Sequence, residues 1–255
     1  MRQTQHDAIR AYYLSLFSAW GRQHWWPAQS RFEVVVGAYL TQNTAWINVE
    51  KALGNLRKAG LLTITGIRRT PQPELEKLIR PAGYFRQKAQ RLKTLVRFLD
   101  DQFGGSLTRM FAVPTAKLRA QLLALNGVGP ETADSILLYA GNHPVFVVDA
   151  YTRRILERHG IVSTATDYEE IRLLFESALT RIGSPKQDLD GAPSATGPVG
   201  SCHAPSRVST AQRTALVQIF NEMHGLIVGV GKTYCLKSQP RCEQCPLQRF
   251  LPQAK

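Results

Sequence analysis

The chain has 255 residues, 44% of them hydrophobic, which is enough apolar material for one large domain or two smaller ones. Its 32 Lys and Arg residues outnumber 19 Asp and Glu residues, and the formal net charge of +13 favours nucleic acid as a partner. The apolar runs are too short to span a membrane, and the N-terminal segment has no signal-peptide core. We therefore expect a cytoplasmic, nucleoid-associated protein with no membrane partner.

Most of the chain has the apolar spacing of helices, which predicts an all-α fold. The ranges with this spacing are 5–20, 46–56, 87–99, 168–182 and 213–230. Two further segments, 32–40 and 145–148, are rich in β-branched residues; we expect a helix for the first and an irregular lead-in for the second. Residues 183–210 are rich in Gly, Pro, Ser and Ala without apolar periodicity, which predicts a flexible loop or linker.

A helical hairpin is predicted at about residues 116–140, around the sequence LNGVGPETAD. The turn is Gly127-Val128-Gly129, and we expect both glycines to take positive φ. Thr132 opens a segment, 132–140, that should be a helix with one buried face. The free amides at its start, with the positive end of its dipole, would suit a phosphate oxygen. A glycine turn is also common in ordinary helical bundles.

The hairpin and the segment VVDAYTRR (147–154) together resemble the helix-hairpin-helix and Gly/Pro-rich loop and aspartate signature of the endonuclease III superfamily of DNA glycosylases. Three further segments, LTQNTAW (40–46), GYFRQKA (83–89) and YCLKSQPRCEQC (234–245), are similar to that family's Gln segment, wedge loop and iron–sulfur loop, in family order.

This resemblance implies two all-helical lobes. They are a six-helix domain at 29–149 and a second lobe of residues 1–28 plus 150–255, which would contain the flexible loop 183–210 and an iron–sulfur-type cysteine loop at 235–251. It further implies a monomer that binds double-stranded DNA with a damaged base flipped out.

Within the superfamily, HWWPAQS (24–30) and HGLIVGVGK (224–232) are most similar to the 3-methyladenine DNA glycosylase III type. The resemblance assigns a pocket for an alkylated purine to Trp25, Trp26, Pro27, Trp46 and Lys232, although that type has Phe where this chain has Trp46. Indole faces attract a cationic alkylated base by cation–π interaction in addition to stacking. The alternative is that Trp25 and Trp26 only pack the core.

Asp149, in VVDAYTRR, is the candidate catalytic residue. A carboxylate there can stabilise the oxocarbenium character of the sugar and steer or deprotonate the attacking water. Asp149 also suits the N-cap of the helix that follows it, and the two roles are compatible. Glu131 stands where the bifunctional type has its Schiff-base lysine, and a carboxylate cannot form an imine. We therefore expect a monofunctional DNA N-glycosylase that hydrolyses the glycosidic bond of alkylated purines such as 3-methyladenine.

Further residues match DNA-contact positions of the family. Gln42 and Tyr84 match those that fill the gap left by the flipped nucleotide and wedge the opposite strand, although both types also occur in ordinary loops. The hairpin residues Gly127, Val128, Gly129 and Thr132 would bind the DNA, and expected backbone contacts are Arg80, Arg86, Lys88, Arg91, Arg153 and Arg154.

Two alternative functions stay open. A bifunctional glycosylase and AP lyase acting on oxidised pyrimidines is disfavoured by Glu131, and a non-catalytic helix-hairpin-helix DNA-binding protein is disfavoured by Asp149.

The cysteines depart from the family pattern. Cys235, Cys242 and Cys245 have the C-x6-C-x2-C spacing of a [4Fe–4S] loop, but Leu251 stands where the fourth ligand is expected. A substitute ligand from Cys202, loss of the cluster, and a Cys₃His zinc site all remain open. A [4Fe–4S] cluster here would support the second lobe and its DNA contacts rather than take part in the chemistry.

Overall fold

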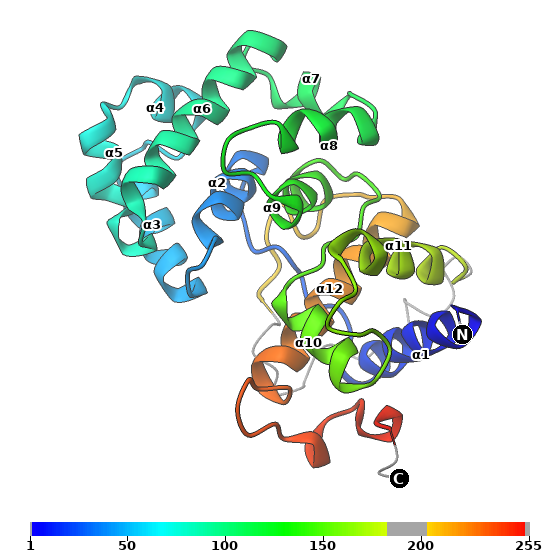
Figure 1. Ribbon diagram of the computed structural model, residues 1–255. Coiled ribbons are helices and arrows are strands. Elements are labelled where there is room, and N and C mark those ends of the chain that lie inside the picture. The colour runs from blue at the N-terminus through cyan, green and yellow to red at the C-terminus, as the bar shows by residue number, and fades with distance from the viewer. Residues whose placement is uncertain (1, 183–202, 253–255) are drawn as a thin grey trace. The chain divides into compact units, whose positions relative to one another are not determined.

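The computed structural model describes residues 2–182 and 203–252, which contain helices and turns but no strands (Figure 1). The predicted all-α fold is confirmed. Cys202 and most of the predicted loop 183–210 lie outside the described residues. Within that loop, residues 206–210 are more ordered than predicted: they form a turn in which Ser206 Oγ accepts a hydrogen bond of 3.1 Å from Ser209 N, and Val208 is buried.

The contacts divide the chain into two compact units, Met1–Pro27 with Pro144–Lys255, and Ala28–His143. The predicted division, 29–149 against 1–28 plus 150–255, differs at residue 28 and at residues 144–149. Asp149 consequently belongs to the same unit as Trp25 and Lys232.

The unit Ala28–His143 is built around a central buried helix. Its helices are α2 (Arg31–Thr41), α3 (Trp46–Lys58), α4 (Ile64–Arg69), α5 (Gln72–Ile79), α6 (Phe85–Phe103), α7 (Leu107–Phe111), α8 (Thr115–Leu123) and α9 (Pro130–Ser135), with a 3₁₀ turn η1 (Arg80–Ala82) and a π-helical turn η2 (Ile136–Ala140). α2 packs against α3, α6, α9 and η2 and is buried from Phe32 to Leu40. The helix expected at 32–40 is confirmed, and its β-branched content reflects burial on every side rather than a strand.

The other unit also has a buried helix at its centre, α12 (Ala215–Thr233), which contacts α1 (Arg2–Trp20), α10 (Ala150–Arg158) and α11 (Tyr168–Leu179). Two 3₁₀ turns, η3 (Cys242–Gln244) and η4 (Gln248–Phe250), follow it. Residues 145–148 form the irregular lead-in to α10, as expected. None of the described helices is long and apolar enough to cross a membrane.

Two details of the hairpin between α8 and α9 differ from the prediction. Only Gly127 takes positive φ (79°), whereas Gly129 has φ −91°. The segment after the turn is buried all round rather than on one face, because α2 packs against it in addition to α8.

Candidate active site

Asp149 is fixed by the helix that it begins. It is the N-cap of α10, and its Oδ1 accepts hydrogen bonds from Thr152 N at 2.7 Å and from Thr152 Oγ1 at 2.9 Å. An N-cap carboxylate is also favoured by the positive end of the helix dipole. Because both bonds use Oδ1, the orientation of Oδ2 is set without consuming its hydrogen-bonding capacity in the cap.

Asp149 Oδ2 lies 3.7 Å from Nε2 of His224, a buried residue of α12. Burial lowers the pKa of His224, while the nearby Asp149 carboxylate opposes that shift. His224 was not among the residues singled out from the sequence. Its signal was available, because it opens the segment HGLIVGVGK that carries part of the family resemblance.

The tryptophan pair lies beside the same histidine. The Trp25 ring centroid is 6.3 Å from that of His224 and 5.6 Å from that of Trp26. Gly225 permits this approach, because a Cβ there would lie 3.1 Å from Trp25 Cβ. Lys232 Nζ lies 5.8 Å from the Trp25 ring centroid, a cation–π contact. The unit therefore gathers a carboxylate, an imidazole, two indoles and an ammonium group.

Not every predicted pocket residue can be placed in this group. Trp25 and Trp26 are only 6% and 5% exposed, as their core-packing alternative also requires. Pro27, which follows them, is half-buried. Trp46 begins α3 in the other unit, so its part in the pocket stays a prediction.

Gln42 is tied to the helical hairpin. Its Nε2 donates to Gly127 O and to Thr132 Oγ1, each at 2.9 Å, and its Oε1 accepts from Arg91 Nη1 at 2.8 Å. The structure thus brings together three of the predicted DNA-binding residues, Gln42, Gly127 and Thr132. Val128 is buried, so the hairpin turn presents backbone rather than an apolar side chain.

Tyr84 is 68% exposed in the turn between η1 and α6, and its role as a wedge stays a prediction. Lys88 is different: it is buried and donates hydrogen bonds to Leu40 O at 2.8 Å, Thr44 Oγ1 at 2.7 Å and Ala82 O at 2.8 Å. Burial, with the Arg91 charge, lowers the pKa of Lys88 to about 8. The predicted phosphate contact of Lys88 is therefore wrong, since its ammonium group is enclosed by the unit.

Of the other arginines predicted to contact the DNA backbone, some are exposed and some bind the protein's own backbone. Arg80 and Arg86 are exposed. Arg154 holds the end of α12 against α10 instead, because its Nε donates to Cys235 O at 2.7 Å and its Nη2 to Gly231 O at 3.1 Å. Arg153 Nη1 donates to Thr166 O at 2.6 Å. Glu131 is exposed in the first turn of α9.

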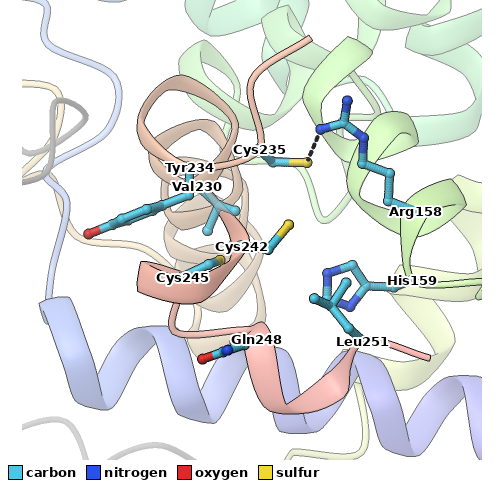
Figure 2. Close-up of a pocket in the computed structure, with 9 residues that line it drawn as sticks. All are labelled: Arg158, His159, Val230, Tyr234, Cys235, Cys242, Cys245, Gln248 and Leu251. Carbon is cyan, nitrogen blue, oxygen red and sulfur yellow. Dashed lines mark hydrogen bonds between the residues drawn. The ribbon is translucent and has the colours of Figure 1, made fainter. Parts of the chain in front are cut away.

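The three C-terminal cysteines line one pocket (Figure 2). Its other lining residues are Arg158, His159, Val230, Tyr234, Gln248 and Leu251. Arg158 Nη1 donates to Cys235 Sγ at 3.2 Å. Burial and the other two cysteines raise the pKa of the Cys245 thiol. Among the described residues, no three His, Cys, Asp or Glu side chains are arranged to hold a single metal ion.

A glycine hairpin between helices, followed by an aspartate that caps the next helix, is the arrangement expected of the helix-hairpin-helix class of base-excision-repair proteins. Residues 36–181 match the HhH-GPD superfamily of base excision DNA repair proteins, and the chain belongs to that family.

Relatives support this placement along the whole chain. The chain is 39% identical to MJ1434 of Methanocaldococcus jannaschii over 98% of both sequences. MJ1434 is named provisionally as a DNA repair glycosylase. The chain is 30% identical to endonuclease III of Thermotoga maritima over 85% of this chain and 80% of that one.

Solved structures of DNA glycosylases are similar to this chain in fold. The 3-methyladenine DNA glycosylase of H. pylori, solved with 1,N6-ethenoadenine, is 29% identical with a TM-score of 0.66, over 89% of this chain and 97% of that one. A DNA complex of endonuclease III shares the fold, with a TM-score of 0.68 and 20% identity over 98% of this chain and 95% of that one.

Proposed function

We propose that the protein is a monofunctional DNA glycosylase that hydrolyses the N-glycosidic bond of alkylated purines such as 3-methyladenine. The observation that carries the proposal is the convergence, within one unit, of the capped Asp149 carboxylate, His224 and the Trp25 indole. Family membership and the likeness to the H. pylori enzyme support the same reaction class.

Asp149 supplies the negative charge for the reaction. As the glycosidic bond breaks, positive charge develops on the sugar, and a carboxylate already held in place stabilises it without reorganisation. The Thr152 bonds at 2.7 and 2.9 Å provide that fixation through Oδ1. Oδ2, beside His224, is the oxygen that would orient or deprotonate the attacking water.

The leaving base determines what else the site needs. A purine alkylated on a ring nitrogen is cationic, so it leaves without an acid and can be selected by indole rings. The ammonium group of Lys232 already makes a cation–π contact with the Trp25 ring. Because both indoles are nearly buried, a flipped base requires movement of the side chains around them.

The partner is double-stranded DNA, bound through the hairpin and the +13 net charge. Glu131 occupies the turn of α9 where a lyase would place its lysine, so hydrolysis rather than imine chemistry follows.

The test is release of free base from duplexes that contain 3-methyladenine, another N-alkylated purine, thymine glycol or a mismatched pyrimidine, analysed with and without alkali. We expect release of the alkylated purines well ahead of the others, strand breaks only after alkali, and no borohydride-trapped adduct with abasic DNA. Efficient excision of thymine glycol with methylated DNA ignored would contradict the substrate class. A strong trapped band would restore the bifunctional alternative, with Lys232 as the candidate amine.

A further inference from the structure

The loop that follows Tyr234, the C-cap of α12, lines one pocket with five residues, three of which are cysteines: Cys235, Cys242, Cys245, Gln248 and Leu251. Cys235 follows the end of α12, Cys242 begins η3 and Cys245 follows it. Backbone bonds from Cys245 N to Cys242 O (3.0 Å), Gln248 N to Cys245 O (2.9 Å) and Leu251 N to Gln248 O (3.0 Å) continue the coil. Leu251 therefore reaches the same pocket, in the position of a fourth ligand, without a donor atom (Figure 2).

The donor set fits three corners of an iron–sulfur cluster. Thiolates are the ligands of such clusters, and each binds a different iron, so they need not converge on one point as they would around a single ion. The Arg158 N–H bonded to Cys235 Sγ at 3.2 Å is the kind of contact that stabilises a ligating thiolate.

One alternative donor in the pocket, His159, is already engaged. His159 lines the pocket, but its Nδ1 is 2.9 Å from the Tyr12 hydroxyl, and its ring also makes a hydrogen bond to the backbone of Phe250. The fourth cysteine of the sequence, Cys202, lies outside the described residues.

We propose that Cys235, Cys242 and Cys245 bind three irons of a [4Fe–4S] cluster, and that the fourth iron, beside Leu251, takes an exchangeable ligand from solvent. That iron is then the one lost on oxidation. The [4Fe–4S]²⁺ form gives one electron to an oxidant such as ferricyanide and releases Fe²⁺, which leaves [3Fe–4S]⁺ on the three thiolates.

The test compares the wild-type chain with two variants. Leu251→Cys restores a fourth thiol, and Leu251→Ser is its matched control, because serine is similar in size to cysteine but has no thiol. Each protein is reconstituted anaerobically with iron and sulfide, oxidised with ferricyanide and desalted. Bound iron and the EPR spectrum are then recorded. We expect wild type and Leu251→Ser to lose about one iron in four and give a three-iron EPR signal. Leu251→Cys should keep its iron and remain EPR-silent.

The wild-type measurement alone can overturn the proposal, whatever the variants do. Wild-type protein that binds no iron, or that keeps four irons through oxidation, contradicts it. In the second case, Cys202→Ser and His159→Asn identify the ligand that was overlooked, because loss of one iron follows only when the true ligand is removed. These readouts do not depend on glycosylase activity, so failure here leaves the proposed function untouched.

Discussion

Asp149 and His224 face each other within one unit, with Oδ2 and Nε2 separated by 3.7 Å. The cap of α10 fixes the first oxygen of the carboxylate, and His224 fixes the environment of the second. A buried neutral imidazole can hold a carboxylate or its water in place without neutralising it. His224 is therefore expected to act on catalysis through Asp149.

Replacing His224 with Phe should lower single-turnover base release about tenfold, which corresponds to a loss of ~1.4 kcal/mol of transition-state stabilisation. The control is a double-mutant cycle with Asp149→Asn. If His224 acts through Asp149, its replacement has little further effect in the Asp149→Asn background. Equal losses in both backgrounds would indicate a purely structural histidine.

The same residue predicts a dependence of stability on pH. The pKa of folded His224 lies below its ordinary value of 6.5, so the unfolded chain binds this proton first as the pH falls. Its contribution to stability is complete above pH 6.5 and is lost as the pH falls through the folded pKa. Thermal unfolding between pH 7.5 and about 5 should show a smaller acid loss in His224→Phe than in wild type. An unchanged slope would contradict this assignment.

The two glycines of the hairpin should respond differently to alanine. Gly127 has φ +79° and a Cβ there would lie 2.0 Å from Arg91 Nε, so Gly127→Ala should destabilise the fold by about 1–3 kcal/mol. A Cβ on Gly129 meets nothing within 4 Å, so Gly129→Ala should fold normally. If phosphate approaches this turn, Gly129→Ala should nevertheless weaken DNA binding in a filter or anisotropy assay. Unchanged affinity would remove Gly129 from the DNA contact.

Lys88 joins the end of α2, the loop at Thr44 and the turn before Tyr84. Lys88→Met removes the hydrogen bond to Leu40 O, whereas Ala82 O keeps a hydrogen bond from Thr44 Oγ1. The change should cost about 1–3 kcal/mol of unfolding free energy in urea, the scale for one unsatisfied buried group. Lys51→Met is the matched control, because Lys51 is exposed on α3. A near-neutral Lys88→Met would mean that these bonds contribute little.

How far the sequence predicts the structure depends on the range of the interactions. Local signals, such as the position of the glycine turn and the Asp149 cap, are correct because neighbours in the sequence determine them, although only Gly127 of the two glycines takes positive φ. Burial is harder to predict: Lys88 carries a charge and was expected on the DNA surface, but it is enclosed by Ala82 O and by two acceptors remote in the sequence, Leu40 O and Thr44 Oγ1.

His224 was missed for the same reason. Its partner Asp149 is remote in the sequence, and although His224 opens the family-like segment HGLIVGVGK, nothing local shows which residue its ring faces. The shared pocket of Cys235, Cys242 and Cys245 is a local consequence of their spacing, whereas the occupant of the fourth corner is not.

The most direct test of the central claim is single-turnover release of 3-methyladenine by Asp149→Asn beside Asp167→Asn. Asp167 is a matched control, because it also caps a helix, α11, and accepts from Glu170 N at 2.7 Å. The account predicts at least about a hundredfold loss for Asp149→Asn, the scale for removing a charge-stabilising group, with DNA affinity and helix content retained. It predicts a rate close to wild type for Asp167→Asn. Near-normal release by Asp149→Asn, or equal losses in both variants, would contradict it.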